Sequence, residues 1–205
     1  MIKGLILGST LVLSACDLPG VPTATGQHFY EQLQLLLPAR FASAPLLVDW
    51  RGFDYGLRQV SATVQCGVRV YDLPRDQVRE FVDDVEAGRS PEAMVDSYGG
   101  QWMHIGAART SGTGNGENAQ VIDARGELPL RSDENFCLMP IAEYRQFAAR
   151  ATALWSRDDT VFKTLHWRLG GGPSGDPIVT ADYYALLDAD QNRLYVWFFS
   201  ASPLG

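Results

Sequence analysis

Two residues near the end of the chain could do acid–base chemistry together. His166 and Asp182 lie in segments 161–169 and 179–187, in which apolar and polar residues alternate. The two segments can pair as antiparallel strands with their apolar sides on one face only if the numbers of two directly opposite residues add up to an even value. One register that meets this condition places His166 opposite Asp182. A carboxylate that orients an imidazole makes it a general base. The pair therefore predicts, as one alternative, hydrolase-type catalysis on the C-terminal sheet.

The same register gathers aromatic and charged residues on one face. It places Arg168 opposite Thr180, and a short turn within residues 188–193 sets Tyr184 beside Trp197. Aromatic residues combined with charged ones are typical of binding surfaces. If the other side faces the core, the exposed candidate surface consists of His166, Arg168, Asp182, Tyr184, Tyr195, Trp197 and Phe199. The alternative is that helices cover this side too, so that the aromatic residues are core and the histidine–aspartate pair is a satisfied polar contact.

No other group of residues predicts a reaction. Residues 188–192, DADQN, have the spacing of a calcium loop, but Arg193 and Phe199 stand where that loop needs glycine and glutamate. The three histidines are scattered, with no pair four residues apart that could bind zinc. The glycine-rich segment 170–177 lacks the lysine of a phosphate-binding loop. We therefore expect no further catalytic set, no metal and no cofactor.

The elements that must position these residues form an α+β pattern. Residues 60–70 alternate between apolar and polar and predict a half-buried strand with Cys66 on the core side. Further strands are expected at residues 46–50, 101–108, 119–124 and 135–141, before the C-terminal meander. Helices are expected at residues 27–37, 74–88, 90–99 and 144–154. The fold class is therefore α+β, an antiparallel sheet with about four helices packed on one face, ending in a three-stranded meander.

The composition limits the partners and the number of domains. The formal net charge is -7 at pH 7, and such an acidic surface repels phosphate backbones, so no nucleic-acid partner is expected. Hydrophobic residues make up 46% of the chain, which favours a packed core over disorder. We expect residues 27–205 to form a single domain.

The N-terminal segment has the order of a secretory signal: Lys3, an apolar stretch and then small residues. Within it, residues 13–16, Leu-Ser-Ala-Cys, resemble the lipobox of bacterial lipoproteins. The resemblance implies cleavage before Cys16, a diacylglyceryl group on its thiol and acylation of the freed amine. Residues 1–15 would then be the signal peptide and residues 16–26 a lipidated tether. The alternative is an ordinary signal peptide with an incidental cysteine, or an uncleaved anchor.

The resemblance also implies a location. A lipid on Cys16 attaches the protein to the cell membrane, with its domain facing the periplasm and an envelope protein as the expected partner. In lipoproteins of enteric bacteria an aspartate after the cysteine favours the inner membrane, and Asp17 occupies that position.

The two remaining cysteines predict a disulfide. Once Cys16 is assigned to lipid, only Cys66 and Cys137 remain, and the exported compartment is oxidising. The alternative is a pair of buried free thiols. From these features we expect a membrane-anchored binding or scaffolding module of the cell envelope, with a periplasmic hydrolase using His166 and Asp182 as the alternative.

Overall fold

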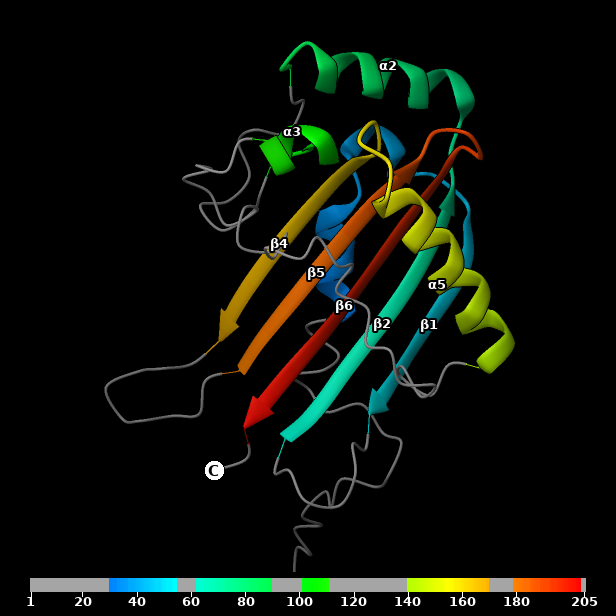
Figure 1. The fold of residues 1–205 in the computed structure, drawn as a ribbon. Coiled ribbons are helices and arrows are strands. Elements are labelled where there is room, and N and C mark those ends of the chain that lie inside the picture. The colour runs from blue at the N-terminus through cyan, green and yellow to red at the C-terminus, as the bar shows by residue number, and fades with distance from the viewer. Residues whose placement is uncertain (1–29, 55–61, 90–100, 111–139, 170–178, 204–205) are drawn as a thin grey trace, which may run out of the picture.

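A six-stranded antiparallel sheet is the centre of the fold (Figure 1). The computed structural model describes residues 30–54, 62–89, 101–110, 140–169 and 179–203. The strands are β1 Leu46–Asp54, β2 Ala62–Asp72, β3 Met103–His104, β4 Val161–Leu169, β5 Val179–Asp188 and β6 Arg193–Pro203. They lie in the order β1-β2-β6-β5-β4-β3. The predicted α+β class and the C-terminal meander β4-β5-β6 are confirmed.

The meander pairs in the register that strand alternation predicts. His166 lies opposite Asp182 in the backbone ladder of β4 and β5. In the next hairpin Tyr184 lies opposite Trp197. The turn between β5 and β6 contains Asn192 with φ of 54°, a left-handed conformation that asparagine adopts more readily than most residues. The short turn thus sets an odd sum for the second hairpin, as expected.

Helices lie on both faces of the sheet, which corrects the expectation that they pack on one. They are α2 Arg75–Glu86, α3 Ile105–Thr110 and α5 Ile141–Trp155, with two 3-10 helices, η1 Leu33–Leu36 and η2 Ala39–Phe41. In Figure 1, α5 lies in front of the strands and the blue η1 and η2 lie behind them. Both faces can be covered because β5 and β6 carry apolar residues at both parities, as with the buried neighbours Tyr183 and Tyr184.

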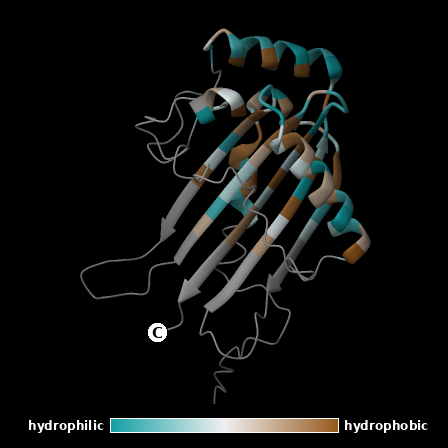
Figure 2. Ribbon diagram, in the orientation of Figure 1, coloured by the Kyte–Doolittle hydropathy of each residue, from teal (hydrophilic) through white to brown (hydrophobic). Residues whose placement is uncertain are grey.

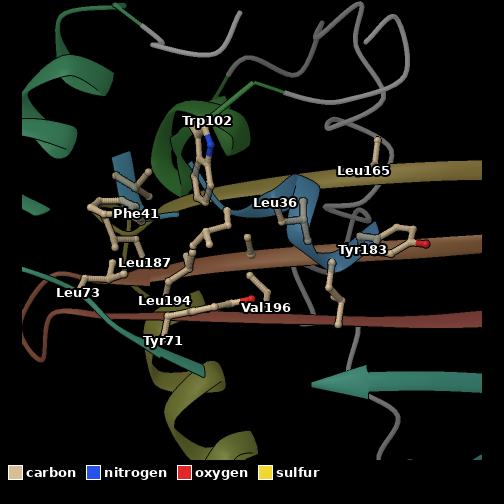
Figure 3. Packing of buried hydrophobic residues seen from close by; sticks show 14 of the residues in the cluster. Leu36, Phe41, Tyr71, Leu73, Trp102, Leu165, Tyr183, Leu187, Leu194 and Val196 are labelled. Carbon is tan, nitrogen blue, oxygen red and sulfur yellow. The ribbon is translucent and has the colours of Figure 1, made fainter. Parts of the chain in front are cut away.

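The first core lies between the sheet and η1, η2 and α2. Its side chains include Leu36, Phe41, Tyr71, Leu187 and Val196, which converge in Figure 3. Phe81 of α2 meets the ring of Phe41 at 5.5 Å and that of Trp102 at 5.2 Å. In Figure 2 the apolar residues of α2 lie on the side turned toward the sheet, as its 3.6-residue stripe predicts.

The second core lies between the opposite face of the sheet and α3 and α5. It contains Phe147 and Ala151 of α5 together with Val68, Phe162 and Trp197 of the strands. The apolar stripe predicted for residues 144–154 is confirmed, since its side chains form the buried face of α5.

The predicted strand over residues 101–108 is wrong in its second half. Only Met103 and His104 pair with β4, and the chain then turns into α3. The Ile105 amide, the first of α3, donates to the Thr160 carbonyl at 2.9 Å and so has a partner outside the helix. Ile105 is buried in the second core, so its apolar character serves a helix rather than a strand.

Several predictions fall outside the described residues. These are the signal segment and tether, the helix at residues 90–99, the strand at 119–124, and residues 135–139 of the strand predicted at 135–141, including Cys137. The end of that last strand prediction is wrong, because Pro140 and Ile141 begin α5. Among the residues that the structure describes, no helix is long and apolar enough to cross a membrane.

Candidate functional site

The aromatic part of the predicted binding surface is buried beneath α5. Trp197 is 0% exposed, and Tyr184 and Tyr195 are 5% exposed, so the expectation of an exposed aromatic face is wrong for these residues. The Trp197 ring stacks on Tyr184 at 5.2 Å and meets the edge of Phe147 from α5 at 5.6 Å. Burial raises the pKa of Tyr184 well above its usual range, so its hydroxyl stays protonated at neutral pH. These aromatics are core residues.

The other predicted surface residues lie further along the same strands. Asp182 is half-buried, and Phe199 is half-buried against the second core, with its ring 5.6 Å from that of Tyr184. The backbone of His166 lies opposite Asp182, and the backbone of Arg168 lies opposite Thr180. The side chains of His166 and Arg168 are outside the described part of the chain. The catalytic pair therefore stays a prediction that rests on its register.

A groove lies on the second-core face, between α5 and the first residues of β1. Its cavity volume is about 520 Å³, within the range of sites that bind small molecules. The sheet supplies an apolar floor through Val68, Val70 and Tyr195. The helix supplies the facing wall through Glu143, Gln146, Phe147 and Arg150. Of the predicted surface residues whose side chains the structure describes, Tyr195 alone lines this groove.

The β1 wall of the groove is shaped by a β-bulge. Leu46 pairs with Tyr71 and Val48 pairs with Val70, which leaves Leu47 as an extra residue in β1. A bulge can turn two consecutive side chains toward one face, and both Leu47 and Val48 line the groove. They are 48% and 36% exposed, so the groove has an apolar rim in contact with solvent.

The end of the groove at the β5–β6 turn carries two arginines in different states. Arg150 donates two hydrogen bonds of 2.6 Å to the fully buried Asp188 carboxylate. These bonds raise the pKa of the Arg150 guanidinium above its usual value. The Gln191 amide donates to the same carboxylate at 3.1 Å. Both hydrogen-bonding edges of Arg150 toward Asp188 are therefore used in joining α5 to the β5–β6 turn.

Arg193 has a looser environment. Its Nη1 donates to Gln191 Oε1 over a long 3.4 Å, and its buried Nε has no acceptor among the described residues. Asp72 and Asp188 lie opposite Arg193 in the flanking strands, but neither forms an ion pair with it within the described part of the chain. An unpaired buried donor costs free energy, so this guanidinium favours an acceptor from a ligand.

A second cavity, of about 550 Å³, lies beside α2 and is polar. Its central carboxylate, Asp84, accepts hydrogen bonds from Arg40 at 2.7 Å and from Arg89 at 3.2 Å. The bond from Arg40 holds the pKa of the Asp84 carboxyl below its usual value. Because Asp84 already pairs with both arginines of its lining, this cavity offers less to a ligand than the groove beside α5.

His104 belongs to a structural corner. Its Nδ1 lies 2.9 Å from the Asp159 carbonyl oxygen. The carboxylate of Asp159 accepts two bonds from Arg157, at 3.0 and 2.9 Å. In the described ranges no three histidine, cysteine, aspartate or glutamate side chains come close enough together to hold a metal ion.

No known protein family, curated protein or solved structure matches this chain. The function therefore has to be argued from the groove and from the N-terminal segment. Sequence alternation predicted Val68 and Val70 as inward residues of a strand and placed Tyr195 on the exposed side, and it carries no signal that the three residues contact Leu47 and α5.

Proposed function

We propose that the protein is a membrane-anchored binding module of the cell envelope, with the groove beside α5 as its ligand site. The observation that carries the proposal is the groove itself, which has an apolar floor, an exposed apolar rim and an arginine whose Nε lacks an acceptor among the described residues. An apolar chain ending in a hydrogen-bond acceptor fits this arrangement. The chain would lie on Val68 and Val70, and the acceptor would pair with Arg193.

The anchor is supported by the N-terminal sequence. The lipobox-like segment ending at Cys16 is followed by a tether rich in proline and glycine, which would hold the domain near a bilayer. Intact mass spectrometry of the protein from native membranes tests this directly. A diacylglyceryl adduct on an N-terminal Cys16, lost in a Cys16→Ser variant, supports the anchor. A mature chain without lipid contradicts it.

The groove is tested by quenching of the intrinsic tryptophan fluorescence. Trp50 packs at the edge of the second core and Trp197 lies within it, so a terminally brominated dodecanol bound in the groove should quench them. The test variant is Leu47→Asp at the rim, and the matched control is Leu35→Asp, since Leu35 is 41% exposed on η1, at the other face. The measurement uses the full chain in lipid nanodiscs.

We expect saturable quenching that Leu47→Asp weakens about tenfold, because the half-exposed leucine loses about 1 kcal/mol of apolar contact and a charge is added. Leu35→Asp should leave the affinity unchanged. Absence of saturable quenching, or equal effects of the two variants, would remove the groove as the binding site.

A further inference from the structure

We propose that β1 is a dimerisation strand that pairs antiparallel with β1 of a second copy of this chain. In the pairing we infer, residue numbers across the interface sum to 100, so that Trp50 meets Trp50 of the second copy and Asp49 meets Arg51. The two sheets would then form one continuous sheet. This inference goes beyond the proposed function and does not depend on a ligand in the groove.

The edge of the sheet at β1 is open and apolar. β1 pairs with β2 on one side and has no strand on the other in the part of the chain that the structure describes. Its first residues, Leu46, Leu47 and Val48, are 42%, 48% and 36% exposed. An edge strand with exposed apolar residues invites pairing with another strand unless something covers it.

The sequence of β1 is self-complementary in only one nearby register. A two-fold axis perpendicular to a continuous sheet pairs positions of equal parity, so the sum of opposed numbers is even. A sum of 98 opposes Asp49 to Asp49, and a sum of 102 opposes Arg51 to Arg51. A sum of 100 opposes Asp49 to Arg51 twice. Like charges directly opposite are destabilising and opposite charges stabilising. Asp49 already accepts a hydrogen bond from Arg69 of its own copy at 3.2 Å, and in the sum of 100 Arg51 adds a second cation beside it, so charge favours this register.

The same register gives the apolar residues beyond the bulge suitable neighbours. It opposes Val48 to Gly52 and places the two Trp50 residues on the axis, while the bulge residue Leu47 lies outside the regular pairing. Trp50 is half-buried against the second core, so both copies present an indole at the same point of the interface. Binding of a strand from another protein would not require β1 to be complementary to itself, so we infer that the occupant is a second copy of this chain.

The first turn of α5 is placed to cover an added strand. In the view of Figure 1 the N-terminal end of α5 projects past β1 at the edge of the sheet. Ile141 at this end is 48% exposed, although it begins a helix whose other large apolar side chains, such as Phe147 and Leu154, are buried. A second β1 would give Ile141 an apolar neighbour. Attachment of both copies to one membrane would raise their effective concentration.

Disulfide trapping in native membranes tests both the dimer and its register. Residues directly opposite in an antiparallel pair have Cα atoms about 4.5–5.5 Å apart, which a disulfide spans. In the proposed register only position 50 meets itself. Positions 49 and 51 lie about 8 Å from their own copies, beyond the reach of a disulfide.

The full chain carrying Trp50→Cys should form a reducible dimer on mild oxidation, at least about fivefold more than Asp49→Cys, Arg51→Cys or the native chain. A mixture of Asp49→Cys and Arg51→Cys copies should crosslink although neither does so alone. This mixed pair keeps Trp50 intact, so it decides the question even where Trp50→Cys fails to fold.

The other outcomes each overturn the inference. Preferential crosslinking of Asp49→Cys or Arg51→Cys with itself would establish a different register. No crosslink above that of the native chain, in either the single variant or the mixed pair, would show that β1 does not bind a second copy and would leave a foreign strand or no occupant. The quenching test of the groove measures ligand binding rather than crosslinking, so its outcome is scored separately; Leu47 lies both at the groove rim and in β1, so the Leu47→Asp variant is also tested for the crosslink of the mixed pair.

Discussion

Removing the guanidinium of Arg150 should destabilise the fold more than any other single ion-pair substitution among the described residues. Arg150→Met keeps much of the side-chain stem but leaves the Asp188 carboxylate buried, with 0% exposure and, among the described residues, only the Gln191 backbone amide as a donor. The two lost bonds are charge-assisted and 2.6 Å long. The pair also joins α5 to the β5–β6 turn, so its loss loosens one wall of the groove.

The size of the effect follows from burial. Breaking a buried ion pair on one side costs about 3–5 kcal/mol. The Arg150 side chain is 29% exposed, which lets water replace part of the lost interaction. We therefore expect a loss of about 2–3 kcal/mol in the free energy of unfolding. The matched control is Arg157→Met, whose guanidinium is 41% exposed and whose carboxylate partners are exposed, so it should cost less than about 1 kcal/mol.

Equilibrium denaturation in urea measures both variants, and a double substitution identifies the cause. Asp188→Leu added to Arg150→Met removes the stranded carboxylate, so the double variant should be more stable than Arg150→Met alone. Two results would refute the reasoning: Arg150→Met costing no more than Arg157→Met, or Asp188→Leu adding its full cost to that of Arg150→Met.

Three further predictions concern other parts of the fold. Gly67→Ala should cost about 1–3 kcal/mol in urea denaturation, because a Cβ there would lie 2.8 Å from the Phe198 ring and 2.9 Å from that of Tyr30; an unchanged midpoint would contradict this packing. Hydrogen bonds from Arg157 lower the pKa of Asp159, so the stability that this carboxylate contributes is complete above about pH 4 and is lost as the pH falls through its folded pKa. In acid titrations the difference in unfolding free energy between the native chain and Asp159→Asn should therefore be constant near neutral pH and shrink below about pH 4. A difference that grows in that acid range would contradict the lowered pKa. Non-reducing peptide mapping should find Cys66 joined to Cys137, a link that would contribute up to roughly 4 kcal/mol, whereas two free thiols would disprove the predicted disulfide.

The order of apolar and polar residues determined much of the sheet. Strand alternation has a period of two, and a short turn leaves few registers that keep one face apolar, so the pairing of His166 with Asp182 and of Tyr184 with Trp197 could be predicted. The apolar stripes of α2 and α5 follow the 3.6-residue period in the same local way. In each case the information lies within a few residues of the element that uses it.

The tertiary structure decided what covers each face. Tyr183 and Tyr184 are apolar neighbours that point to opposite sides, and alternation cannot tell whether the second side meets solvent or a helix. Ile105 begins α3, and its amide, which has no partner within the helix, donates to the Thr160 carbonyl, a partner distant in sequence. The groove joins Leu47, Val70, Phe147 and Arg193, which come from four separate elements. Local residue patterns carry no information on such tertiary contacts, because these contacts depend on how complete helices and strands pack against one another.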